Sequence, residues 1–218
     1  MRLIDLSHTI YTGMPAFNPD WQPVIEPFMT HEQAAASGRY LDCSCEVTRV
    51  SLITSIGTYM DSPYHFHASR ATIDRLSLDQ TVLPAVVIDC TNASPREPLS
   101  PARLSNVDIR GKAVLLHTNW DRYWGQPEYF EYPFISRDLA LALVDGGAKL
   151  AGMDFLAADD FRDPRRPAHV NLLGADVLIV ENLTHLDDLP RDGFIFHAAP
   201  VKIQNAAAFP VRAYAVLP

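Results

Sequence analysis

The residues best suited to chemistry lie together in one short segment, residues 55–67. In this segment the carboxylate of Asp61 precedes the imidazole of His65, with glycine and proline close by. Glycine and proline interrupt regular periodicity, and the preceding residues 45–54 are rich in β-branched side chains. The pattern predicts a site loop that follows a strand, with Asp61 and His65 at the strand's exit.

This segment resembles the signature of the putative cyclase family, which includes bacterial kynurenine formamidase and isatin hydrolase. The family signature is His-x-Gly-Thr-His-x-Asp-x-Pro-x-His. The residues that match it at the right spacing are Gly57, Thr58, Asp61, Pro63 and His65. Ser55 and Tyr59 stand where the family has two metal-binding histidines.

Further segments resemble the same family along nearly the full chain. They are Asp5–His8, Gly13–Pro15, the pair Asp154 and Asp159, the stretch from Pro167–His169 through Val180–Leu183, Phe196–Pro200 and Pro210–Ala213. The resemblance implies a mixed α/β fold, a swivelling β/β/α domain with a central barrel-like sheet and flanking helices. It also implies assembly as a homodimer or homotetramer.

The resemblance implies a metal site at Asp61, His169 and Glu181, where the family's ligands are retained. Two carboxylates and one imidazole suit a hydrolytic Zn²⁺ or Mn²⁺ with open coordination positions. The histidines replaced by Ser55 and Tyr59 serve only one half of the family's two-metal cluster. We therefore expect at most one tightly held divalent metal.

His65 is the predicted catalytic residue, because it occupies the family's catalytic histidine position and imidazole exchanges protons readily near neutral pH. The resemblance implies a hydrolase for an amide, formamide, lactone or lactam bond of a small molecule. In such a reaction the metal activates water and His65 protonates the departing amine. We also expect Phe17, Trp21 and Ser55 to contact the substrate, although the two aromatic rings could instead pin their own loop.

Two other functions stay open. Without a metal, Asp61 and Glu181 would form a pair of close carboxylates that cannot both ionise at low cost. With His65 as acid or base and Tyr59 as a phenol donor, they could serve a metal-free cyclase, dehydratase or isomerase. The third possibility is a non-catalytic protein that binds a small molecule.

Composition sets the limits of these functions. The chain has 218 residues, 48% of them apolar, which suits a single domain over residues 1–218. It has neither an apolar window long enough to span a bilayer nor a signal-peptide pattern, so we expect a cytoplasmic protein. A net charge of -8 without a basic cluster argues against nucleic acid or an anionic membrane as partner.

The predicted elements favour a mixed α/β architecture over a doubly wound parallel fold. A helix is expected to begin at Ser136 and to end at Gly146, and helices should cover the apolar strands. Residues 11–38 are expected to be irregular, and Asp159 to belong to a solvated loop of mixed charge. The predicted strands are Arg2–Ile10, Ala85–Cys90, Ala113–His117, Lys149–Met153 and Val177–Val180.

Overall fold

The computed structural model describes all residues from Met1 to Pro218. By their contacts the residues divide into two compact units. Unit 1 consists of Met1–His8 and Thr54–Pro218, and unit 2 consists of Thr9–Ile53. No helix combines the length and the apolar character needed to cross a membrane.

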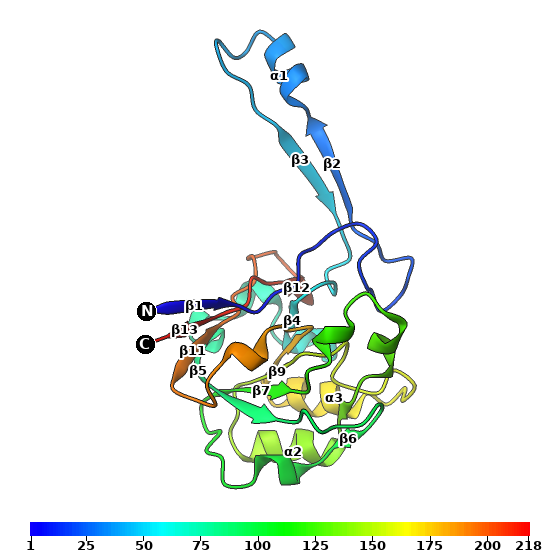
Figure 1. The fold of residues 1–218 in the computed structure, drawn as a ribbon, viewed down its shortest axis with the longest axis vertical. Coiled ribbons are helices and arrows are strands. Elements are labelled where there is room, and N and C mark those ends of the chain that lie inside the picture. The colour runs from blue at the N-terminus through cyan, green and yellow to red at the C-terminus, as the bar shows by residue number, and fades with distance from the viewer. The chain divides into compact units, whose positions relative to one another are not determined.

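Unit 1 is built on a mixed sheet of nine strands that curls into a half-barrel (Figure 1). The strand order across the sheet is β1-β13-β11-β5-β7-β9-β10-β4-β12. The strands from β5 to β10 in this order pair in parallel, and the strands on either side pair antiparallel. The predicted mixed α/β class is therefore confirmed.

The bounds of the nine strands are β1 (Arg2–Asp5), β4 (Tyr59–Asp61), β5 (Val82–Asp89), β7 (Ala113–His117), β9 (Leu150–Met153), β10 (Leu178–Glu181), β11 (Phe194–His197), β12 (Ala208–Pro210) and β13 (Tyr214–Leu217). A separate parallel pair in unit 1 consists of β6 (Pro98–Leu99) and β8 (Phe134–Ile135). The predicted strand at Ala113–His117 has the bounds of β7, whereas the first predicted strand ends at Asp5 rather than at Ile10.

The central strands are buried on both faces. Along β7, Val114 joins a core cluster with helices α2 (Arg137–Asp145) and α3 (Pro167–Gly174). Leu115 on the opposite face joins a second cluster that consists of strand and loop residues. A side chain at Gly152 would place a Cβ atom 2.6 Å from Leu115 in that second core. Helices thus cover one face, and the curled sheet itself covers the other.

Helix α2 follows the predicted capping pattern. The side chain of Ser136 accepts a hydrogen bond from the backbone N–H of Leu139 at 3.1 Å, which satisfies one free donor of the first turn. The helix ends at Asp145, just before the predicted Gly146. Leu139 and Leu143 are fully buried against the sheet, so local capping and burial agree.

Unit 2 contains an antiparallel hairpin and a short helix. Strands β2 (Val24–Met29) and β3 (Val47–Ser51) pair with each other, and helix α1 (His31–Ala36) lies between them in sequence. Thr30 caps α1 through a capping box with Gln33. The prediction of an irregular stretch through residue 38 was wrong here, because β2 contains a proline and α1 is too short to show a helical period.

His8 occupies an unusual place in unit 1. Its ring stacks on Trp124 with centroids 3.8 Å apart, and its Nε2 atom is buried without a hydrogen-bond partner. Burial lowers the pKa of His8 from 6.5 to about 4, the nearby charge of Asp121 opposes this shift, and His185 adds to it. The folded protein therefore holds His8 neutral at pH values where the unfolded chain protonates it.

We expect this histidine to make the fold less stable in mild acid. Between about pH 6.5 and about pH 4 the unfolded state binds more protons at His8, so the free energy of unfolding falls as pH falls, by at most about 3 kcal/mol. Urea unfolding of the chelator-treated protein at pH 7 and at pH 5 measures the loss. His8→Phe keeps a stacking ring and should show a smaller loss; equal losses in both proteins would contradict the prediction.

Candidate metal centre and active site

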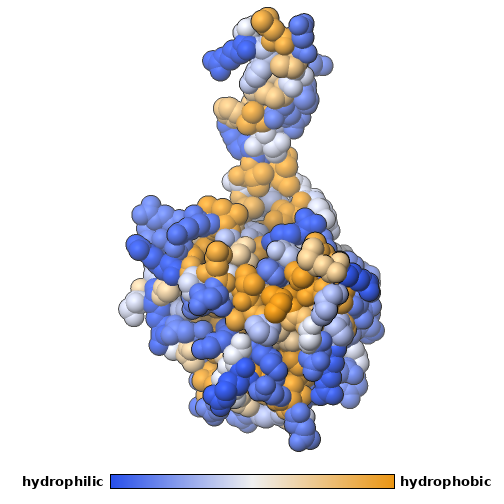
Figure 2. All heavy atoms as spheres, turned by 90° about the vertical axis from the view of Figure 1, so that its left-hand side faces the viewer, coloured by the Kyte–Doolittle hydropathy of each residue, from blue (hydrophilic) through white to orange (hydrophobic).

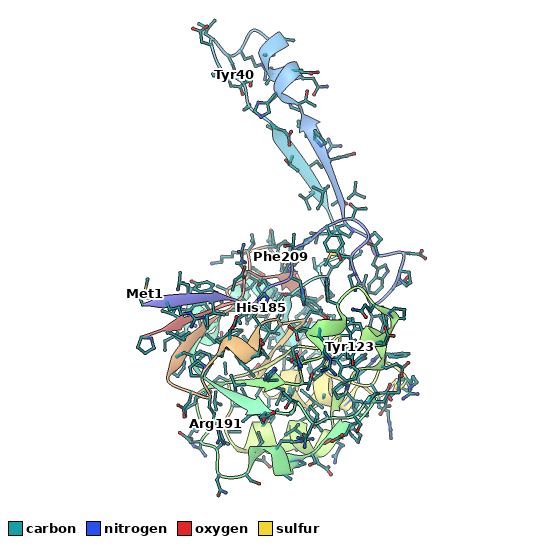
Figure 3. The ribbon with its side chains drawn as sticks, in the orientation of Figure 1. Met1, Tyr40, Tyr123, His185, Arg191 and Phe209 are labelled. Atoms are coloured by element: carbon teal, nitrogen blue, oxygen red, sulfur yellow. The ribbon has the colours of Figure 1, made fainter.

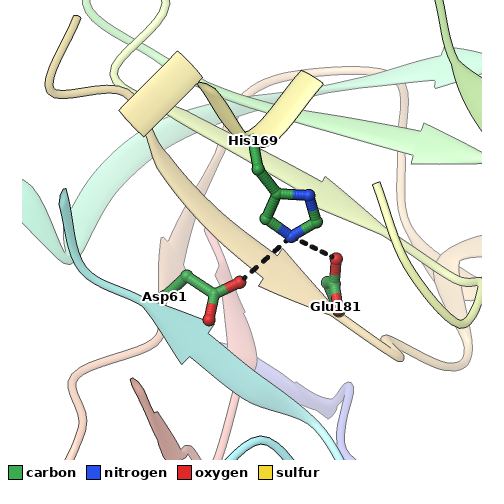
Figure 4. Close-up of side chains that lie close together, drawn as sticks. All are labelled: Asp61, His169 and Glu181. Atoms are coloured by element: carbon green, nitrogen blue, oxygen red, sulfur yellow. Dashed lines mark ion pairs between the residues drawn. The ribbon is translucent and has the colours of Figure 1, made fainter. Parts of the chain in front are cut away.

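Three buried side chains converge at one end of the parallel strands, as Figure 4 shows: Asp61, His169 and Glu181. Their candidate ligand atoms all lie within 4.8 Å of one another. His169 Nε2 is 3.2 Å from Glu181 Oε1 and 3.7 Å from Asp61 Oδ2. The three residues that the resemblance implied as metal ligands are therefore brought together.

The sheet register explains this convergence. Asp61 is the last residue of β4 and Glu181 the last residue of β10, and the two strands pair with Asp61 opposite Ile179 and Tyr59 opposite Glu181. Tyr59, Asp61 and Glu181 consequently share the face of the sheet on which helix α3 packs. His169 belongs to helix α3, which packs on that face.

The segment around Asp61 differs from its prediction. Residues 59–61 were expected to form part of a loop at the exit of a strand over residues 45–54. That strand is β3 of unit 2, and residues 59–61 form β4, which is held between β10 and β12. Long-range pairing overrides the turn-forming glycine and proline on either side of this short strand.

Asp61 has the clearest signature of a cation ligand. Its side chain is completely buried, and neither carboxylate oxygen has a hydrogen-bond partner. Burial of an ionised carboxylate without hydrogen bonds is strongly unfavourable unless a positive charge compensates it. The two nearest cationic candidates are His169 and His65, whose Nε2 atoms lie 3.7 Å and 3.6 Å from Asp61.

Glu181 is held at both of its oxygens. The backbone N–H of Ala158 donates a hydrogen bond to Oε1 at 2.7 Å, and the hydroxyl of Tyr59 donates to Oε2. Oε1 is also the atom that faces His169 Nε2. Burial, together with the charges of Glu181 and Asp61, raises the pKa of Tyr59 well above its ordinary value, so Tyr59 remains a neutral donor.

His169 is oriented by a buried aspartate. Its Nδ1 atom lies 2.7 Å from Asp159 Oδ2, which turns Nε2 toward Asp61 and Glu181. The same carboxylate accepts hydrogen bonds from the backbone N–H groups of Ala168 and His169 and so caps α3. Burial alone would lower the pKa of His169, but the hydrogen bond with Asp159 and the nearby carboxylates of Asp61 and Glu181 raise it well above its ordinary value.

Asp159→Asn should weaken metal binding although residue 159 does not belong to the ligand group. Loss of a carboxylate that orients a ligand histidine typically costs about 10- to 100-fold in metal affinity. Loss of the charged cap should also lower the free energy of unfolding by about 1 kcal/mol. Competition with a chelating dye measures the affinity. Asp160→Asn, which changes the neighbouring ion pair with Arg96, is the control and should bind metal as the wild type does.

Asp159 was misjudged from the sequence. It was expected in a solvated loop of mixed charge, yet its side chain is only 1% exposed, and only its neighbours Asp160 and Asp163 pair with arginines there. Phe66 was not singled out at all, although its ring stacks on His169 with centroids 4.7 Å apart. The signal available in the sequence was Pro167, since proline often occupies the first position of a helix, but it does not indicate that Asp159 caps that helix.

His65 lies beside the buried group but remains accessible. It ends a short 3-10 helix at Pro63–His65, its side chain is 29% exposed, and its Nε2 atom is 3.6 Å from Asp61 Oδ1. Its ring centroid is 6.1 Å from that of His169. An accessible imidazole next to a buried ligand group can carry protons between a bound molecule and water.

The three residues expected to contact substrate belong to different units. Ser55 is half-buried in the bend before β4. Phe17 and Trp21 belong to unit 2, where their ring centroids lie 6.3 Å apart. Their contact with a substrate stays a prediction.

The residues present fit a divalent metal ion. The donor set of two carboxylates and one imidazole matches hydrolytic metal sites, and the unpartnered oxygens of Asp61 supply the charge that such an ion needs. His169 and Glu181 are each oriented by second hydrogen bonds, as ligands of protein metal sites usually are. Asp61, His169 and Glu181 would hold the ion.

Comparison with known proteins agrees with this geometry. A sequence profile described as putative cyclase matches residues 4–160. Kynurenine formamidase of Geobacillus thermodenitrificans is 29% identical over 214 residues, which cover 96% of this chain and 95% of the relative.

Two solved structures share the fold. Isatin hydrolase A from Labrenzia aggregata, bound to benzyl benzoate, superposes with a TM-score of 0.85 at 24% identity and covers 99% of this chain and 93% of its own. A potential metal-dependent hydrolase with cyclase activity gives 0.80 at 26% identity and covers 98% of this chain and 96% of its own. The protein therefore belongs to the putative cyclase family.

Proposed function

We propose that this protein is a metal-dependent hydrolase that cleaves an amide-type C–N bond in a small molecule. The observation that carries the proposal is the buried carboxylate of Asp61, which has no hydrogen-bond partner and lies beside His169 and Glu181. A related kynurenine formamidase acts, by its name, on a formamide, which supports an amide substrate here.

Metal binding and proton transfer belong to different residues in this proposal. Asp61, His169 and Glu181 would bind one Zn²⁺ or Mn²⁺ ion. When bound, such an ion polarises a carbonyl group and lowers the pKa of water to a value near neutrality. His65 is placed at the accessible side of this group, where it can donate a proton to the nitrogen that departs.

The test combines metal content with hydrolysis. Protein purified without an affinity tag is analysed for bound metals and assayed with an N-formyl aromatic amine, an aryl lactam and a small lactone. We expect hydrolysis of the formamide or the lactam that is lost after chelation and restored by Zn²⁺ or Mn²⁺. Turnover that survives complete metal removal would overturn the proposal and favour acid–base chemistry by His65 with the Asp61 and Glu181 carboxylates.

We further propose that the protein functions as an assembly of identical chains, because the hairpin of unit 2 is unsuited to stand alone. None of the residues in β2 and β3 is buried, and Ile25 lies opposite Val50 on one exposed face. Tyr40, labelled in Figure 3, lies between α1 and β3 and is also exposed. A two-stranded hairpin is at best marginally stable in water, so a covering partner is expected.

A second copy is the partner that best fits the hairpin. Glu26 and Arg49 lie opposite each other and form an ion pair at 3.5 Å, so a two-fold axis could exchange these opposite charges between two identical hairpins. Figure 2 shows hydrophobic residues gathered on one face of unit 1. Leu3 of β1 and Ile195 of β11 are exposed apolar side chains of this unit.

Ile25→Asp combined with Val50→Asp should dissociate the assembly. Two buried, unpaired carboxylates at an apolar contact oppose association, whereas in the monomer water solvates them. Light scattering during gel filtration should give a multiple of 24.3 kDa for the wild type and a lower mass for the variant. Leu78→Asp, a change at another exposed apolar residue, is the control. A wild-type mass of one chain would contradict the proposal.

A further inference from the structure

Tyr59 fills a place that the family signature gives to a histidine, and in this chain its phenol contacts Glu181 rather than projecting as a free ligand. The contact follows from the register of the sheet, because Tyr59 and Glu181 are directly opposite each other in β4 and β10. Tyr59 is 9% exposed and Glu181 is fully buried. The hydroxyl of Tyr59 and the Oε2 atom of Glu181 therefore each have a hydrogen-bond partner within the protein.

We propose that Tyr59 is a positioning residue that fixes Glu181 as a ligand through one oxygen and closes the adjacent place to a second metal ion. The proposal rests on the metal dependence proposed above. The two hydrogen bonds of Glu181 come from separate segments, the loop residue Ala158 on Oε1 and Tyr59 of β4 on Oε2, and together they set the plane of the carboxylate. Only Oε1 is turned toward His169.

This arrangement defines what each oxygen can do. A metal held with His169 and Asp61 would use Oε1, which already faces them. A second ion would need to bind Oε2, but that oxygen already accepts the hydrogen bond of the Tyr59 hydroxyl. Ser55 has no imidazole that could bind this second ion. The chain is therefore built for a single ion, and the hydroxyl of Tyr59 contributes to its affinity.

Tyr59→Phe tests the positioning role because it keeps the ring and removes only the donor. Zn²⁺ affinity, measured by competition with a chelating dye, should fall about 10- to 100-fold. The Co²⁺-loaded variant should also show a changed visible spectrum, because Glu181 becomes free to rotate and to use both oxygens. Tyr129→Phe removes another buried phenol, one that donates to Asn182 at 2.7 Å, and should change neither readout.

A further pair of measurements separates positioning from direct ligation and tests the exclusion of a second ion. Loading the wild type with Fe³⁺ should give no phenolate charge-transfer band, whereas such a band would show that Tyr59 is itself a ligand and overturn the proposal. Ser55→His combined with Tyr59→His should raise the metal content toward two ions per chain. An unchanged content of one would show that these positions do not control the number of ions.

The outcomes distinguish this inference from the proposed function. A wild type that binds Zn²⁺ but hydrolyses no amide would overturn the function and leave the positioning role to be decided by affinity and spectrum. A wild type that hydrolyses amides, beside a Tyr59→Phe variant with unchanged Zn²⁺ affinity and Co²⁺ spectrum, would overturn the positioning role alone. A wild type that binds no metal would overturn both.

Discussion

Asp61→Asn is expected to abolish metal binding and, with it, hydrolysis. The substitution keeps the shape of the side chain and removes the one carboxylate that is buried without hydrogen bonds. Loss of a residue that only orients a ligand costs about 10- to 100-fold in affinity, so loss of the ligand itself should exceed about 100-fold. Elemental analysis after dialysis, together with the rate of formamide hydrolysis, measures both effects.

The control for this experiment is Asp154→Asn, because Asp154 is equally buried but differently bonded. Its oxygens accept hydrogen bonds from the backbone N–H of Thr118 and of Asn119 and from the Thr118 hydroxyl. Loss of that carboxylate should destabilise the fold and leave the metal content of the folded protein unchanged. If Asp61→Asn retained its metal while Asp154→Asn lost it, the ligand group would be placed wrongly.

The elements that the sequence predicts well are those whose signals are local. The apolar run at Ala113–His117 is buried on both faces and becomes β7 with the same bounds. Ser136 caps the predicted helix, which ends before Gly146. In each case the pattern of burial or the cap belongs to a few consecutive residues, so no knowledge of the distant chain is required.

The elements that the sequence misses depend on distant partners. Residues 59–61 become a strand only because β10 and β12 pair with them, although turn residues surround them. Asp159 is buried because it caps α3 and bonds His169, ten residues further along the chain. Its neighbours are charged and exposed, so composition alone indicates a solvated loop.

The three residues that converge could be named from the sequence, but their geometry could not. Asp61, His169 and Glu181 could be named by resemblance, since each stands at a matching position. The contact between Tyr59 and Glu181 could not, because it depends on which residue of β4 lies opposite the end of β10. A shift of the register by one residue would turn Tyr59 to the other face of the sheet.

His65→Gln is expected to lower kcat/KM for an amide about 10²- to 10⁴-fold while the metal content stays unchanged. The expected difference follows from the position of His65. Its Nε2 atom is 3.6 Å from Asp61 and its side chain is accessible, whereas the three proposed metal ligands are buried. Glutamine preserves size and polarity but cannot transfer a proton. Steady-state kinetics with the formamide, beside elemental analysis of each preparation, measures the separation of catalysis from metal binding.

The leaving group provides the stricter test of this role. An amine departs poorly without a proton, whereas the alcohol of an ester with the same acyl group needs less assistance, so His65→Gln should slow the amide more than the ester. His67→Gln is the matched control, since His67 lies in the same segment and contacts the backbone carbonyl of Val170 at 3.0 Å. Equal losses for amide and ester would mean that His65 positions the substrate, and loss of metal in the variant would mean that it supports Asp61. Only a selective loss for the amide, with metal retained, fits a proton donor to the departing nitrogen.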